Sequence, residues 1–100
     1  MPSNNIEIEQ AVLGSLLLNV NAYPEVDAKL SADDFISQVH SDIYKCIKNL
    51  ADSGKGTDYI SVSRELDRNN LLERIGGVDY LKLLQDTPVT ARNAESYAES

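Results

Sequence analysis

The sequence predicts a small domain built only of helices. Apolar residues recur at three- and four-residue spacing along residues 4–18 and again along residues 38–52, which is typical of amphipathic helices. In contrast, no strand pattern extends beyond the neighbourhood of Tyr59 and Ile60. One hundred residues correspond to about one domain with a single modest hydrophobic core.

The first helix is expected over residues 4–18, the longest apolar-rich segment of the chain. Asn4 is suited to cap this helix by accepting the backbone N–H of Glu7. Glu7 and Glu9 then lie in the first turn, where the helix dipole favours carboxylates. Small side chains form a notch where another helix can cross closely, or, alternatively, where a partner protein docks. They are Ala11, Gly14 and Ser15.

A short second helix is expected over residues 22–30, with Pro24 in its first turn, where the missing N–H costs little. Ser31 and Asp34 then have the spacing of a capping box, with Asp in place of the usual Glu. The single turn that they cap is expected to bury Phe35, which is the only phenylalanine in the chain.

The second long helix is expected over residues 38–52, with one apolar stripe at helical spacing. His40 begins the stripe, and we interpret it as a partly buried histidine paired with a neighbouring group, because the chain has no second histidine. Cys46 adjoins the stripe and is expected to behave as a small apolar residue. The polar residues expected to face solvent are Asp42, Lys45, Lys48 and Asn49.

The segment after this helix is less regular. Residues 58–60 are expected to be extended, and Ser61 is expected to cap a helix that stops at Asn69. The apolar residues on the predicted helices should share one core. They are Leu13, Leu16, Leu17, Phe35, Ile43, Ile47, Leu66 and Leu81.

The last part of the chain begins with a turn at Gly76 and Gly77, where unusual backbone angles are needed. The helix that follows is expected to end at Thr87-Pro88, because proline cannot continue a helix. A further helix is expected to begin within residues 91–100 and to continue in a larger protein.

Charge and residue content exclude several classes of function. The net charge is −7, and no basic patch is available to neutralise phosphates, so we expect no strong binding of nucleic acid. The acidic balance of residues 61–86 also disfavours a DNA-binding helix–turn–helix there. A single cysteine excludes an internal disulfide, and with a single histidine it excludes a Cys/His zinc site.

No catalytic, cofactor-binding or metal-binding residue is predicted. Gly54-Lys55-Gly56 does not match a phosphate-binding loop, since Gly56 stands where that motif has a serine or threonine. Paired acids such as Asp33-Asp34 are more typical of helix caps than of catalytic dyads. The chain shows neither a membrane-spanning segment nor a secretory signal. We therefore expect a cytoplasmic interaction module.

Several short blocks follow one another along nearly the whole chain. They are Glu9 to Gly14 with Leu16 to Leu18, Asp33-Asp34-Phe35, His40 with Ile43-Tyr44, Asp58 to Val62 with Glu65-Leu66, Ile75 to Val78 with Tyr80-Leu81, and Thr87-Pro88 with Ala91, Asn93 and Tyr97. Each block alone is weak evidence. In this order and spacing they resemble the N-terminal domain of the bacterial replicative DNA helicases, the DnaB family.

The resemblance implies a variable tail over residues 1–5, a compact multi-helix head over residues 6–88, and the start of a C-terminal helical hairpin over residues 89–100. Domains of this family form the N-terminal collar of a two-tiered hexamer and contact primase and, in some species, the helicase loader. The parent protein is then an ATP-dependent DNA helicase. Its ATP, magnesium and single-stranded DNA sites belong to a C-terminal domain outside this chain, which itself carries no catalytic site.

A partner interface is expected on the helix after the glycine turn, at Tyr80, Leu83 and Asp79. Tyr80 has two interpretations: it packs inside with its hydroxyl paired, or its ring lies at the surface as an anchor for primase or a neighbouring collar domain. The alternative function is a free-standing, phage-type homologue that binds and regulates a host helicase or primase. A phosphate-binding loop downstream of residue 100 would indicate a helicase. A stop codon directly after residue 100 would indicate the free-standing homologue.

Overall fold

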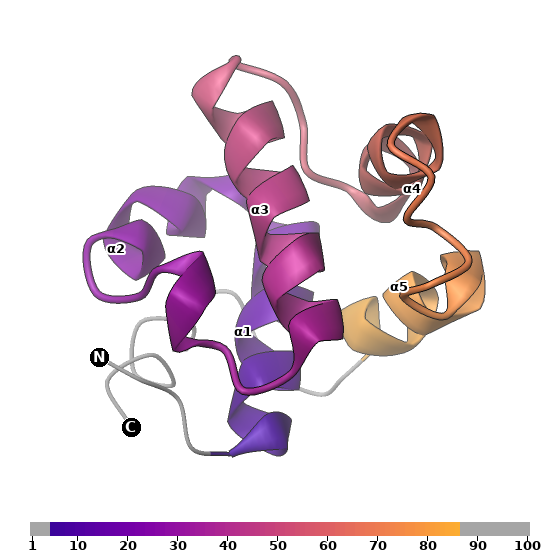
Figure 1. The fold of residues 1–100 in the computed structure, drawn as a ribbon. Coiled ribbons are helices and arrows are strands. Elements are labelled where there is room, and N and C mark those ends of the chain that lie inside the picture. The colour runs from indigo at the N-terminus through magenta and orange to yellow at the C-terminus, as the bar shows by residue number, and fades with distance from the viewer. Residues whose placement is uncertain (1–4, 87–100) are drawn as a thin grey trace.

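The computed structural model describes residues 5–86, and within this range every regular element is a helix. The elements are α1 (Ile6–Leu18), the 3₁₀ turn η1 (Val20–Ala22), α2 (Tyr23–Asp27), the 3₁₀ turn η2 (Ala32–Asp34), α3 (Gln38–Asp52), α4 (Tyr59–Arg68) and α5 (Gly77–Gln85). Helix α1 packs against α3 and α5, and α4 packs against the same two helices. Helix α2 lies on the side of α1 and α3 opposite to α4 (Figure 1). The predicted all-helical head is therefore confirmed.

The hydrophobic core surrounds the middle of α1. All the residues expected in the core are buried, so that prediction is confirmed. Full burial of a leucine side chain contributes about 1.5–3 kcal/mol. The small residues Ala11, Gly14 and Ser15 are buried as well. The notch that they form is thus covered within the chain, which agrees with close helix crossing and leaves no open notch for a partner.

Helix α1 begins at Ile6, and its cap lies one residue later than predicted. Asn5 caps it, with its side-chain oxygen accepting the N–H groups of Glu7 at 2.8 Å and Ile8 at 3.4 Å. The predicted cap, Asn4, lies outside the described residues. Both asparagines satisfy the preference for a capping side chain, and the sequence alone does not separate them.

The helix expected over residues 22–30 is shorter in the structure. Helix α2 ends at Asp27, and the chain turns there with the Val26 carbonyl accepting the N–H groups of Lys29 at 3.0 Å and Leu30 at 2.9 Å. The next turn follows the prediction. Asp34 Oδ2 accepts the N–H of Ser31 at 2.9 Å, as in a capping box, and Phe35 is buried.

Helix α3 has the predicted bounds, but one of its expected solvent-facing residues is buried. The Asp42 side chain accepts Gln38 Nε2 at 3.0 Å and Arg74 Nη2 at 3.0 Å. The turn after α4 brings Arg74 to α3. The Asp42 carboxylate, which was expected to face solvent, is therefore paired with a guanidinium group. The helix periodicity of α3 carries no information about this distant residue.

The expectation of an extended segment over residues 58–60 was wrong. Helix α4 begins at Tyr59, and Asp58 is its cap, accepting the N–H of Ser61 at 3.2 Å. Ser61, the predicted cap, lies in the first turn and donates its hydroxyl to Asp58 Oδ1 at 2.7 Å. The predicted helix end at Thr87-Pro88 and the predicted hairpin over residues 89–100 lie outside the described residues.

Candidate docking surface on helix α5

Helix α5 places the three predicted interface residues on one side. Gly76 precedes the helix with a φ of +107°, and a Cβ added there would lie 3.0 Å from the Tyr80 Cβ, so glycine allows this close approach. On the other side of α5, Leu81 is buried in the core. Asp79 is exposed, Leu83 is 56% exposed, and Tyr80 is half-buried.

The Tyr80 hydroxyl is fixed in the interior by two side chains. It lies 2.5 Å from His40 Nε2 and accepts a hydrogen bond from Gln10 Nε2 at 3.3 Å. The rings of Tyr80 and His40 are nearly parallel, with centroids 6.0 Å apart. The structure thus combines features of both interpretations of this residue. Its hydroxyl is paired inside, while part of the side chain stays accessible beside Asp79 and Leu83.

A buried carboxylate lies behind this pair. Glu9 is only 1% exposed, although the helix dipole already explains an acid in the first turn of α1. Its Oε1 lies 2.7 Å from His40 Nδ1, and its Oε2 accepts the backbone N–H of Ile36 at 2.6 Å. Oε1 also accepts the Ser37 N–H at 3.4 Å. Three groups therefore replace the water that Glu9 loses on burial.

The hydrogen-bond donors in this network follow from the chemistry of the groups. With the His40 tautomer that carries its proton on Nδ1, this nitrogen donates to the Glu9 carboxylate. In the neutral imidazole, Nε2 then accepts the hydroxyl proton of Tyr80. The hydroxyl oxygen remains free to accept from Gln10. Each side chain in this hydrogen-bonded series, which runs from Gln10 through Tyr80 and His40 to Glu9, therefore has a compatible partner.

Sequence reasoning missed Glu9, Gln10 and Ile36 as parts of this site. One signal was present for Glu9: it stands four residues before Leu13 on the buried face of α1, and His40 likewise begins the apolar stripe of α3. Polar residues on two buried faces need partners, and pairing them with each other satisfies both. No comparable signal marks Ile36.

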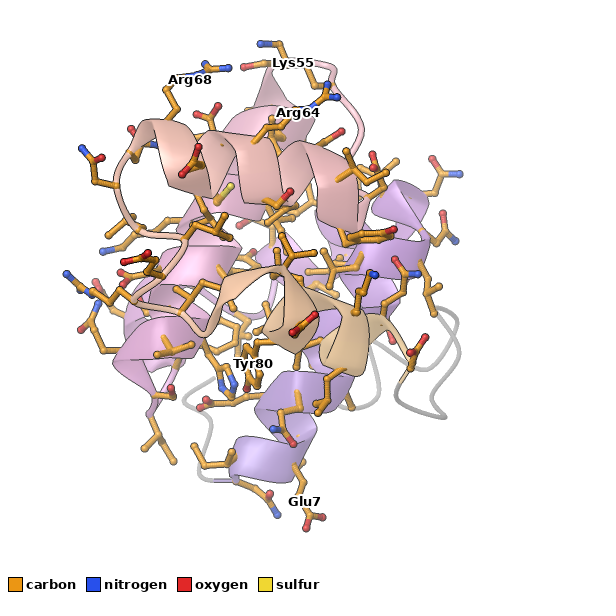
Figure 2. All side chains as sticks on the ribbon, turned by 90° about the vertical axis from the view of Figure 1, so that its right-hand side faces the viewer. Glu7, Lys55, Arg64, Arg68 and Tyr80 are labelled. Carbon is orange, nitrogen blue, oxygen red and sulfur yellow. The ribbon has the colours of Figure 1, made fainter. Side chains whose placement is uncertain are left out.

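The segments whose side chains hold the Tyr80 hydroxyl also carry exposed apolar and acidic residues. Ile36 is 58% exposed, and Ile6, at the start of α1, is also exposed. Tyr80 lies between α5 and α1, with Glu7 projecting from the first turn of α1 (Figure 2). The cations Lys55, Arg64 and Arg68 gather at the opposite end of the molecule from Glu7 (Figure 2). Glu7 is therefore well separated from these three cations.

Other features of the described residues offer less chemistry. No group of three or more His, Cys, Asp or Glu side chains within residues 5–86 is placed to hold a metal ion. Burial raises the pKa of the Cys46 thiol to about 12, so this residue is a poor nucleophile. Across the same range no helix has the length and apolar character needed to cross a membrane.

Comparisons with known proteins agree on one family. The family model described as the DnaB-like helicase N-terminal domain matches residues 1–100. The replicative DNA helicase DnaB of Mycobacterium leprae is 41% identical over 97 residues, which are 97% of this chain and 16% of that protein. The replicative DNA helicase DnaC of Bacillus subtilis is 39% identical over 99 residues, 99% of this chain and 22% of that protein. The chain thus spans about a fifth of the length of these relatives.

A solved structure gives the same result. The crystal structure of the N-terminal domain of DnaB helicase from Mycobacterium tuberculosis superposes with a TM-score of 0.93 at 40% sequence identity. The similarity covers 99% of this chain and 71% of that one.

Proposed function

Because this chain belongs to the family of DnaB-like helicase N-terminal domains, we propose that it is the collar domain of a hexameric replicative DNA helicase. The relatives that match it along almost its whole length are replicative DNA helicases, which supports this role. In the parent protein a C-terminal domain hydrolyses ATP with magnesium and moves along single-stranded DNA in the cytoplasm. The collar domain contributes protein contacts to that enzyme.

The contact that we assign to this domain is the docking of primase on the surface formed by Tyr80, Leu83 and Asp79. The observation that carries the assignment is the state of Tyr80: its hydroxyl is held by His40 and Gln10, while its side chain is only half-buried. A fixed aromatic side chain loses little conformational entropy when a partner binds. Aromatic residues next to apolar neighbours such as Leu83 often dominate the energy of an interface.

Other partners follow from the same role. Collar domains associate with those of neighbouring subunits, and we expect the helicase loader to bind the assembled collar. Association should strengthen when the chain is extended beyond residue 100, since additional apolar area stabilises such interfaces. Single-stranded DNA is expected to contact the parent protein through its C-terminal domain, because the described domain gathers only a small cationic cluster.

Calorimetric titration of the full-length helicase with its cognate primase tests the docking role. Leu83→Ala is expected to weaken binding about tenfold or more while leaving the melting temperature nearly unchanged, because Leu83 is exposed. Leu18→Ala is the matched control, since Leu18 is 52% exposed at the end of α1. Equal affinities for the wild type and Leu83→Ala would reject this surface, and no binding by the wild type would reject primase as the partner.

A further inference from the structure

Ile36 is an exposed apolar side chain on a firmly held backbone. It lies between η2 and α3, and 58% of its surface is exposed. The preceding residue, Phe35, is buried, and the following one, Ser37, caps α3 by accepting the N–H of His40. Its own N–H donates to Glu9 at 2.6 Å. The loop therefore holds the backbone of Ile36 in place while its side chain is exposed to solvent.

The group that holds Ile36 also fixes Tyr80. From the Ile36 N–H the hydrogen bonds run to Glu9 Oε2, from Glu9 Oε1 to His40 Nδ1, and from His40 Nε2 to the Tyr80 hydroxyl. Each of these contacts is between 2.5 and 2.7 Å long. Two accessible side chains from segments far apart in sequence are thus set relative to each other by one buried carboxylate.

This link distinguishes Ile36 from other exposed apolar residues. Single exposed apolar side chains are normal on protein surfaces and need no partner. Ile60, for example, is 46% exposed on α4, and its helix carries Arg64 and Arg68 at the other end of the molecule from Glu7. Ile36 instead shares its support with Tyr80.

We propose that Ile36 and Tyr80 are two anchors of one docking surface. Glu9 is the positioning residue, which fixes the position of the two anchors relative to each other. The occupant is an apolar segment bordered by lysine or arginine, because Asp79 is exposed next to Tyr80 on α5 and Glu7 is exposed two residues before Glu9 on α1. This inference rests on the proposed docking function, under which the segment belongs to primase.

The first experiment titrates the full-length helicase with its cognate primase and compares Ile36→Ala with Ile60→Ala. We expect Ile36→Ala to weaken binding about tenfold and Ile60→Ala to leave it within about twofold, with similar melting temperatures for both. Wild-type affinity in Ile36→Ala would overturn the inference while leaving the docking function standing. Absence of binding by the wild-type helicase would overturn both.

The second experiment tests Glu9, which is buried and cannot touch the partner. Glu9→Ala removes the acceptor for the Ile36 N–H, so amide exchange at Ile36 should accelerate and primase affinity should fall about tenfold. Glu9→Gln keeps an oxygen for that N–H and should restore slow exchange at Ile36 and most of the affinity. If either variant shows fast exchange at Ile36 while it is folded and yet binds primase like the wild type, Glu9 has no positioning role.

Discussion

The carboxylate of Glu9 and the imidazole of His40 lie 2.7 Å apart in the interior, although 31 residues separate them in the sequence. Removing one partner leaves the other without this hydrogen bond in the interior, which costs about 1–3 kcal/mol, and truncation of the buried imidazole adds the loss of its packing. His40→Ala is therefore expected to lower the free energy of unfolding by about 3 kcal/mol or more. Urea unfolding of the domain followed by circular dichroism measures this loss.

His40→Asn is the matched control for this prediction. The asparagine amide can occupy the place of Nδ1 and donate to Glu9, but it cannot reach the Tyr80 hydroxyl. We expect His40→Asn to be destabilised by about 1–2 kcal/mol, clearly less than His40→Ala. Equal losses for the two variants would mean that the contact with Glu9 does not stabilise the fold.

The turn before α5 yields a second prediction. Gly76 has a φ of +107°, and a Cβ at this position would meet the Tyr80 Cβ at 3.0 Å. Gly54 also has a positive φ, +72°, but a Cβ added there would have no neighbouring atom within 4 Å, so only backbone strain applies. Strain of this kind costs about 1–2 kcal/mol.

Gly76→Ala should therefore lower the unfolding free energy by more than Gly54→Ala. The additional loss comes from displacement of Tyr80, which should also weaken primase binding by Gly76→Ala. Thermal unfolding of both variants checks the first part, and titration with primase checks the second. A larger loss for Gly54→Ala would contradict the assigned packing of Gly76 on Tyr80.

Cys46 yields a prediction about reactivity. Its thiol donates to the Val62 carbonyl at 3.6 Å, and burial raises the pKa of the thiol to about 12. At pH 8 the folded domain therefore carries far less thiolate than the unfolded chain, in which the thiol pKa is about 8.5. Iodoacetamide should modify Cys46 in denaturant and leave the folded domain unmodified over the same period.

The same pKa difference makes stability depend on pH. Above pH 8.5 or so the unfolded chain releases the thiol proton first, so the folded state binds more protons and unfolding becomes more favourable. Stability is retained at neutral pH and falls by up to about 1.4 kcal/mol per pH unit between pH 9 and 10. Cys46→Ala should show a smaller fall across this interval. A fall of the same size in that variant would assign the effect to other groups.

The sequence was informative where periodicity determined the structure. The apolar stripe of α3 predicted both ends of that helix, and the predicted core is buried as one cluster. Such stripes depend on near neighbours, and burial of apolar area drives the packing without requiring a specific partner. Fold class and core membership therefore follow from the sequence alone.

The polar interior could not be predicted in the same way. The helix dipole was a sufficient local explanation for Glu9, and exposure to solvent was a sufficient one for Asp42. Both residues are instead buried against partners about thirty residues away in the sequence. The choice between Asn4 and Asn5, or between Asp58 and Ser61, as helix caps depends on loop geometry. The residues Tyr80, Leu83 and Asp79 lie on one side of α5, and both their docking role and their partner stay predictions.

The last prediction concerns Thr57, whose buried hydroxyl donates to the Leu16 carbonyl at 2.9 Å. Helix α1 ends at Leu18, so this carbonyl is among the last four of the helix, which commonly lack a partner within it. Thr57→Val keeps the shape of the side chain and removes the donor. We expect a loss of about 1–3 kcal/mol in unfolding free energy, because a buried acceptor is left unpaired.

Thr57→Ser separates the hydroxyl from the methyl group. Serine keeps the donor for Leu16 and loses one buried methyl group, at a cost of about 0.8 kcal/mol. For a domain of this size each kcal/mol lowers the melting temperature by about 4–8 °C, so the two variants are distinguishable by calorimetry. Thr57→Val should melt first. If Thr57→Ser melted at the same temperature as Thr57→Val or at a lower one, the prediction would be wrong. Thr57 would then stabilise the fold through packing of its methyl group and not through its hydrogen bond to α1.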